Sequence, residues 1–451
     1  KNSLGMGAVG RRNFCGGVDG AESWGRLGWI RRKAESCHIM RKRVFWPVLA
    51  LMLPLVLTLI CWVPPAAALT ENQQLFSQAW RIVNRAYLDD TFNHQNWWLL
   101  REKSLKQPLA TREETYGAIE GMLASLDDPF TRLSKPEQYR SLQVNTAGEL
   151  TGIGLQIALD SESGTIQAIA PIEGSPAFDA GLQPGDLIWE IDGVSTVGLT
   201  LDEAAARMRG PVGTVVVLTV QRVDSQIRET IELVRSRIAL NPVVTSLEVS
   251  QTGVPVGYIR LGQFNGNATA EVAAAINKLE ELQAQAYILD LRNNPGGLLQ
   301  AGIEIARLWL DSGTIVYTVN RQGTLGSFEA TGEALTDDPL VVLIDRGTAS
   351  ASEILAGALQ DNQRAVLLGE RSFGKGLIQS LFDLADGSGL AVTVAKYETP
   401  NHRDINKLGI TPDRVVSRGD LVPTQLASSA DPQYQAAIDF LSTEAVLAHA
   451  S

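Results

Sequence analysis

The segment Asp345–Gln379 reads DRGTASASEILAGALQDNQRAVLLGERSFGKGLIQ and predicts the centre of an α/β fold. It follows an apolar strand over 340–344 and begins with a turn of small residues. An amphipathic helix over about 350–360 and a second apolar strand over 365–368 come next. Strands that alternate with helices in this way are typical of α/β proteins.

The alternation continues on both sides of this segment, so we assign residues 237–425 to an α/β core. Asp386-Gly387 predicts a hairpin that gives this core a β-rich edge. The other expected elements are strands over 257–264, 286–291, 314–319, 377–384 and 390–397, and helices over about 272–282 and 298–310.

Two further regions precede the core, and a tail follows it, so the fold class is multidomain α+β. Residues 69–147 predict a helical domain, with capping-box patterns that begin at Thr70, Thr111 and Ser134. Residues 148–236 predict short strands separated by glycine turns, with helices over 175–180 and 201–208. Residues 426–451 are rich in Ser, Ala and Gln, with one helical stretch and no indication of a site.

The segment 148–236 resembles a PDZ domain in four pieces: TGIGL (151–155), SPA (175–177), GLQPGD (181–186) and IDG (191–193). In PDZ domains the backbone N–H groups of the first piece hold a peptide's terminal carboxylate, while the peptide adds a strand to the sheet edge. Read alone, these glycines would only make a tight turn. The resemblance assigns binding of a substrate's C-terminus to Gly152, Ile153, Gly154 and Leu155.

The first 68 residues differ from the rest in charge. They hold ten of the 39 Lys/Arg and three of the 50 Asp/Glu, which leaves residues 69–451 with a net charge of −18. Nucleic acid would repel such an acidic body, so we expect no nucleic-acid partner. A basic cluster at 41–43, an apolar run over 44–63 and an Ala-rich end predict a signal peptide cleaved after Ala68, with the start at Met40. A retained membrane anchor is the alternative.

Composition also limits the chemistry. All three cysteines precede Ala68, so the exported protein would have no disulfide, no cysteine nucleophile and no Cys-based metal site. The later histidines, His94, His402 and His449, are widely spaced. We therefore expect neither a metal site nor a cofactor.

Ser350 has two interpretations. With Glu353 it forms the S-x-x-E pattern of a capping box, so it would be the N-cap of the following helix. A serine at a helix N-terminus is also a candidate nucleophile, because the N–H of Ala351 would face the oxygen of an attacked carbonyl. The two roles are compatible. Ser352 is the alternative nucleophile.

Lys375 is the candidate base, because an uncharged, apolar setting would lower its pKa. Gln379 would orient it if this segment is helical. Gly296, in the Asn-Pro-Gly-Gly stretch at 294–297, would supply a second oxyanion donor, unless the stretch is only a turn. The stretch 369–375 also matches the G-x-x-x-x-G-K of a P-loop, but Gly376 stands where the magnesium-binding hydroxyl belongs.

Over about 69–422 the chain resembles the carboxyl-terminal processing proteases, a family of exported serine endopeptidases with a Ser/Lys pair. The motifs that carry the resemblance are GTASASE (347–353), SFGKG (372–376), LRNNPGG (291–297) and GITPD (409–413). The resemblance implies that Ser350 is the nucleophile, Lys375 the base and Gln379 its orienting partner. It likewise implies that Gly296 and Ala351 supply the oxyanion-hole amides.

Within this family, residues 79–97 are similar to the cyanobacterial and plastid members. Those remove a C-terminal extension from a photosystem II reaction-centre subunit in the thylakoid lumen. The resemblance thus implies a protein substrate with an exposed C-terminus, export to the thylakoid lumen or periplasm, and proximity to a membrane through the substrate. The alternatives are a general processing or quality-control protease of the same family and a non-catalytic PDZ scaffold that binds peptides.

Overall fold

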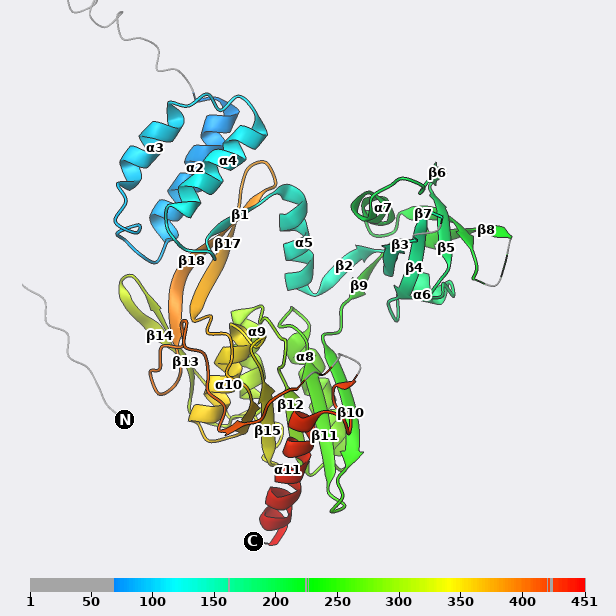
Figure 1. The fold of residues 1–451 in the computed structure, drawn as a ribbon, viewed down its shortest axis with the longest axis vertical. Helices are drawn as coiled ribbons and strands as arrows, with labels where there is room; N and C mark the ends of the chain where they lie inside the picture. Colours follow the sequence, from blue (N-terminus) through cyan, green and yellow to red (C-terminus); the bar gives the residue numbers. More distant parts are fainter. Residues whose placement is uncertain are drawn as a thin grey trace, which may run out of the picture. The chain divides into compact units, whose positions relative to one another are not determined.

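The computed structural model describes residues 69–450 apart from 161–162, 224, 226, 420 and 422–424 (Figure 1). The predicted signal peptide, its cleavage after Ala68 and the start at Met40 lie outside these residues. None of the described helices is both long and apolar enough to cross a bilayer. Helices and sheets occur together in the described regions, which confirms the predicted multidomain α+β class.

The region 69–147 is helical, as predicted. Thr70 and Thr111 complete capping boxes at the starts of two helices. The capping box predicted at Ser134 is wrong, because that helix begins at Pro136 and Ser134 lies in a short strand. The elements are α2 (Glu71–Ala86), α3 (Trp97–Leu105), α4 (Arg112–Ala124), β1 (Arg132–Ser134) and α5 (Pro136–Ala147).

A hairpin from the core completes this helical region. It consists of β17 (Leu377–Asp383) and β18 (Gly389–Glu398), and β18 pairs antiparallel with β1. Leu390 and Val392 of β18 belong to the same apolar cluster as the buried side chains of α2 and α4. The helical region and the core therefore share packing that the helical periodicity did not indicate. The same sheet continues through β13 (Thr314–Asn320) to β14 (Gly323–Glu329).

Residues 148–236 form the predicted region of short strands. Its main sheet has the strand order β3-β4-β5-β7-β8, so β3 lies at an edge. The chain turns between β2 and β3 at Gly154, whose φ is +72°. The elements are β2 (Glu149–Gly152), β3 (Leu155–Leu159), β4 (Ile166–Pro171), α6 (Pro176–Asp179), β5 (Leu187–Ile191), β6 (Val194–Ser195), α7 (Leu201–Met208), β7 (Val215–Gln221) and β8 (Arg228–Val234), and β9 (Ser236–Ala239) pairs with β2.

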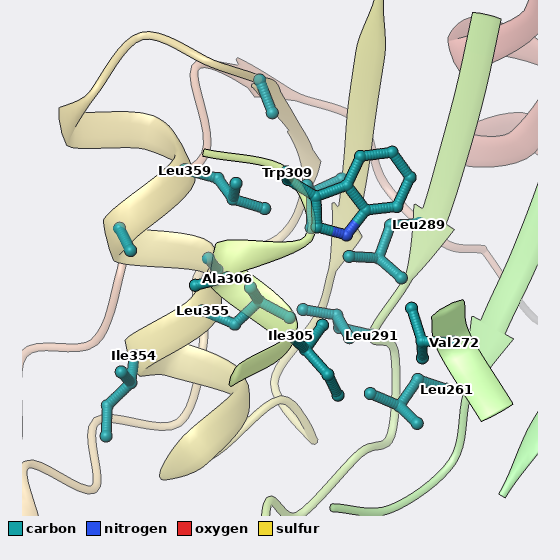
Figure 2. Packing of buried hydrophobic residues seen from close by; sticks show 14 of the residues in the cluster. Leu261, Val272, Leu289, Leu291, Ile305, Ala306, Trp309, Ile354, Leu355 and Leu359 are labelled. Carbon is teal, nitrogen blue, oxygen red and sulfur yellow. The ribbon is translucent and has the colours of Figure 1, made fainter. Parts of the chain in front are cut away.

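The core contains a six-stranded sheet with the order β10-β11-β12-β15-β16-β19. Helices α8, α9 and α10 pack on one face, and Figure 2 shows Trp309, Leu289 and Leu355 in the apolar cluster between them and the sheet. The elements are β10 (Val243–Val249), β11 (Pro255–Leu261), α8 (Ala268–Glu281), β12 (Ala286–Asp290), α9 (Leu299–Arg307), β15 (Leu340–Ile344), α10 (Ala351–Asp361), β16 (Val366–Gly369), β19 (Arg414–Val415) and α11 (Pro432–Ala450).

The C-terminal tail contributes to this core, although its sequence indicated no role. Tyr434, Ala437, Ile438 and Leu441 of α11 are buried in a cluster with side chains of β11, β12 and β15. Helix α11 thus covers the sheet face opposite α8, α9 and α10.

The central strands β12 and β15 are parallel neighbours and are buried at every residue. Apolar runs of this kind are typical of strands covered on both faces. Because parallel strands end at the same edge of a sheet, the segments 291–298 and 345–350 that follow them come together there. These two segments contain Gly296 and Ser350 of the predicted site.

Candidate active site

All five residues predicted for catalysis line one cavity of about 630 Å³. Ser350 and Ala351 come from the start of α10, Gly296 from the loop after β12, and Lys375 and Gln379 from the start of the hairpin. Its other lining residues include Phe130 and Arg132 from the helical region and Leu298, Leu299 and Tyr397 from the core. The fold therefore gathers these residues from segments far apart in the chain.

Ser350 has an unusual backbone conformation, with φ +59° and ψ −118°. Non-glycine residues rarely adopt such angles, and they persist only where the surroundings enforce them, which is often at functional sites. The N–H of Ser350 donates to Oε2 of Glu353 at 2.8 Å, as in a capping box. The N–H of Glu353 donates instead to the main-chain carbonyl of Ser350, and the side chain of Ser350 makes no capping hydrogen bond. The Ser350 hydroxyl is therefore not committed to the cap.

The alternative nucleophile, Ser352, has a different environment. It is fully buried, and its hydroxyl donates to the main-chain carbonyl of Asn294 at 3.0 Å. It is not among the residues that line the cavity. Its geometry favours a structural role.

Lys375 is partly buried, and burial lowers the pKa of its amine from the usual range. The positive charge of Arg132 lowers this pKa further, whereas the carboxylates of Glu353 and Asp128 oppose the shift. Among the described residues, the Nζ of Lys375 makes no ion pair, and it lies 5.0 Å from the ring centroid of Phe130. A lysine in this setting can be neutral and act as a base.

Gln379 lies in β17, the strand that the Asp386-Gly387 hairpin predicted, so the helical geometry in which it would reach Lys375 does not occur. It is next to a register shift between Ile378 and Gln379, and its Nε2 donates to Oγ1 of Thr393 at 3.3 Å. Gln379 still lines the cavity beside Lys375.

The P-loop alternative is not supported by the local fold. In a P-loop the lysine opens a helix whose N-terminus faces the phosphates. Here strand β17 begins two residues after Lys375. The match to G-x-x-x-x-G-K is therefore coincidental.

The loop at Gly296 packs directly against the turn at Ser350. A Cβ on Gly296 would lie 2.8 Å from the Cβ of Ser350 and 2.9 Å from the nitrogen of Ala351, so only glycine fits there. The N–H of Ala351 is at the first position of α10, where a helix leaves its amides without an intrahelical partner. The N–H of Gly296 donates to Oδ1 of Asn294 at 2.9 Å.

Glu353 is a residue of the site whose role the sequence did not indicate. Its side chain is fully buried and accepts hydrogen bonds from two segments. The donors are the N–H of Ser350 (2.8 Å), the N–H of Lys375 (2.9 Å), the N–H of Gly374 (2.7 Å) and the hydroxyl of Ser372 (2.5 Å). One carboxylate thus connects the main chains of the predicted nucleophile and the predicted base. The S-x-x-E pattern was the only sequence signal, and it indicated a cap alone.

A second buried network holds the loop after β12. The guanidinium of Arg292 bonds Asp290 at 2.6 Å and Asp431, just before α11, at 2.8 Å. All three side chains are buried, so each charge depends on its partner. The network ties the start of the loop that carries Gly296 to the C-terminal helix.

The predicted peptide-binding loop, 152–155, lies between β2 and the edge strand β3. A Cβ on Gly154 would lie 2.3 Å from the Cβ of Ser175, and the φ of Gly154 is +72°, so the loop needs glycine at this position. Gly152 lies beside the C-terminal end of α7, where its Cβ would be 3.4 Å from the carbonyl of Met208. An edge strand beside a helix is the arrangement in which PDZ domains add a peptide strand.

Comparison with known proteins agrees with this arrangement. Residues 255–416 match the model of peptidase family S41, and residues 169–222 match a PDZ domain. A carboxyl-terminal-processing protease of Synechocystis sp. is 61% identical over 411 residues, which cover 91% of this chain and 96% of that protein. The chain belongs to peptidase family S41.

Other relatives support the same assignment. The chloroplastic carboxyl-terminal-processing peptidase 2 of Arabidopsis thaliana is 48% identical over 361 residues, covering 78% of this chain and 70% of that protein. The solved structure of a photosystem II D1 C-terminal processing protease is 41% identical, with a TM-score of 0.53, and the match covers 81% of this chain and all of that one. The chain is thus a carboxyl-terminal processing peptidase of the serine class, with a PDZ domain, that acts on protein substrates.

Proposed function

We propose that this peptidase cleaves its substrates with Ser350 as nucleophile and Lys375 as general base. The neutral amine of Lys375 takes the hydroxyl proton of Ser350 as Oγ attacks the carbonyl carbon of the scissile bond. Lys375 then gives this proton to the leaving amine, and an acyl-enzyme remains on Ser350. Water, deprotonated by Lys375, hydrolyses the ester and releases the new C-terminus.

The observation that carries this proposal is the shared cavity. A serine with a strained backbone at a helix N-terminus lines it together with a lysine whose pKa is lowered by burial. The N–H of Ala351 and the amide of Gly296 would hold the oxyanion, and this requires the Gly296 N–H to turn from Asn294 towards the substrate. Gln379 would orient the lysine from β17 rather than from a helix.

The substrate's C-terminus would bind in the PDZ domain. The amides of Gly152, Ile153, Gly154 and Leu155 would take the terminal carboxylate, and the last residues of the substrate would pair with the open edge of β3. This binding would concentrate chains with a free C-terminus near the cavity.

The solved relative that is named a photosystem II D1 C-terminal processing protease favours one substrate, the precursor of a photosystem II reaction-centre subunit with its C-terminal extension. The enzyme would then act after export, in the thylakoid lumen or periplasm, beside the membrane that holds this substrate. General processing or quality control by the same site is the second candidate, because a PDZ domain reads little beyond the last residues of a chain.

The experiment compares two substrates. The exported form would be incubated with the reaction-centre precursor and with an unrelated lumenal or periplasmic protein that has an unfolded C-terminus, and the products identified by mass spectrometry. Cleavage of the precursor at one position, with the second protein intact, supports dedicated processing. Equal cleavage of both proteins supports a quality-control function. Binding of either protein without cleavage would support the alternative of a non-catalytic peptide-binding scaffold.

A further inference from the structure

A buried tyrosine hydroxyl lies between the two catalytic segments. Tyr397 of β18 is 1% exposed, and its ring is part of the main apolar cluster of the core. Its hydroxyl is 2.5 Å from the main-chain carbonyl of Lys375 and 3.1 Å from that of Ser350. The main-chain N–H of Tyr397 also donates to the carbonyl of Gly376, at 3.0 Å.

We propose that Tyr397 is a positioning residue for catalysis. Its hydroxyl holds the main chains of Ser350 and Lys375 in the relative position that brings nucleophile and base together. This inference rests on the roles proposed above for those two residues. Tyr397 contacts the carbonyl groups of both residues, whereas Glu353 accepts from their N–H groups. Glu353 and Tyr397 together thus fix the main chain of each catalytic residue through its N–H group and its carbonyl group.

The two carbonyls depend on Tyr397 to different degrees. The carbonyl of Ser350 also accepts hydrogen bonds from the N–H groups of Glu353 and Ile354, at 2.8 and 3.0 Å. Within the described part of the chain, the carbonyl of Lys375 accepts only the hydroxyl of Tyr397. Removing this hydroxyl would leave a partly buried carbonyl without a donor from the protein, so the main chain at Lys375 would shift to find another donor.

The segment around Lys375 is held by separate hydrogen bonds. Residues 370–376 belong to neither helix nor strand. The N–H of Phe373 donates to the carbonyl of Thr348 at 3.0 Å, and the carbonyl of Gly374 accepts from the N–H of Lys407 at 2.8 Å. The carbonyl of Lys375 depends on Tyr397, so losing that bond would move the main chain at Lys375 in particular. Lys375 owes its reactivity to burial, and a shift of its main chain would expose the amine to water. Tyr397 thus affects the base without touching its amine.

Tyr397 acts as a donor and not as a base itself. Burial raises the pKa of its hydroxyl well above the usual range, and the charge of Glu353 raises it further. The hydroxyl therefore keeps its proton. Both of its partners are acceptors only, so the two carbonyls share this single proton, and the shorter contact is to the carbonyl of Lys375.

The test uses Tyr397→Phe, with Tyr287→Phe as the matched control. Tyr287 is equally buried in the same core cluster, and its hydroxyl donates to Glu280 at 2.7 Å, away from the cavity. For Tyr397→Phe we expect kcat to fall by about 10- to 100-fold, because small displacements of catalytic groups have effects of this size. KM should stay within about twofold, and the acid limb of the pH–rate profile should move to higher pH as Lys375 becomes exposed.

A third variant separates positioning from folding. Site-specific replacement of Tyr397 by 4-aminophenylalanine keeps N–H donors at the same place, and it should restore kcat to within about threefold of the wild-type value and restore the acid limb. If Tyr397→Phe does not fold, the 4-aminophenylalanine variant tests the inference alone. A 4-aminophenylalanine variant that folds but is inactive would overturn the inference. The inference also fails if Tyr397→Phe matches Tyr287→Phe in kcat and pH profile. Ser350→Ala is measured in the same assay, because full activity of that variant would refute the proposed function rather than the role of Tyr397.

Discussion

Replacing Glu353 by glutamine tests whether one buried carboxylate organises the site. Gln has the shape of Glu, but its amide offers one acceptor oxygen and one NH₂ donor. In the native protein Oε1 accepts from Ser372 and Gly374, and Oε2 accepts from Ser350 and Lys375. If the NH₂ group faces Ser350 and Lys375, both of these N–H groups lose their acceptor. If it faces Ser372 and Gly374, the N–H of Gly374 loses its acceptor, whereas the hydroxyl of Ser372 can accept from the amide.

The expected cost follows from these contacts. A hydrogen bond to a charged group contributes about 1.5–3 kcal/mol, so losing one or two should lower the free energy of unfolding by about 1.5–6 kcal/mol. That is a large part of the ~5–15 kcal/mol that stabilises a typical domain. The peptide segments of Ser350 and Lys375 would also separate, and we expect activity to fall by at least ~100-fold.

The measurement is urea unfolding followed by tryptophan fluorescence, together with the cleavage rate of a C-terminally extended substrate. The control is Glu114→Gln, which changes the same residue type in the exposed capping box of α4. That change should cost at most about 1 kcal/mol and leave cleavage unaffected. A Glu353→Gln protein with the urea midpoint and cleavage rate of the wild type would refute the role assigned to this carboxylate.

Three further changes have defined outcomes. Because burial lowers the pKa of Lys375, the folded protein binds fewer protons at this site than the unfolded chain does at pH values between that lowered pKa and 10.5. The free energy of unfolding should therefore rise with pH through this range. Lys375→Met should remove this contribution in urea titrations at several pH values, and an unchanged pH dependence would contradict the assignment. Gly296→Ala should reduce kcat by at least ~100-fold, since its Cβ would lie 2.9 Å from the nitrogen of Ala351; a normal kcat would show that the loop does not border the oxyanion. Arg292→Met should lower the free energy of unfolding by about 3–5 kcal/mol, because two buried aspartates lose their partner, and a wild-type melting temperature would argue against the network.

Local patterns were enough to predict the elements that carry the site. The apolar period and the capping box predicted helix α10, and the Asp386-Gly387 turn predicted the hairpin, because each depends on residues close in sequence. Ser350 and Lys375 could be proposed for the same reason. A hydroxyl at a helix start and a lysine between glycines are visible without knowledge of the fold.

What the sequence did not indicate depends on distant contacts. The strand β1 has three residues, too few for a period, and exists because it pairs with β18. The roles of Tyr397 and Asp431 arise from partners that lie 22 to 139 positions away. The hydrogen bond from Gln379 to Thr393 likewise depends on the pairing of β17 with β18.

The identity of the nucleophile is tested most directly by mass spectrometry of a C-terminally extended substrate after incubation with the wild-type protein, Ser350→Ala and Ser352→Ala. We predict a new C-terminus with the wild type and with Ser352→Ala, and none with Ser350→Ala, whose circular dichroism should match the wild type. Cleavage by Ser350→Ala at the wild-type position and rate would contradict the assignment of Ser350 and, with it, the Ser/Lys mechanism.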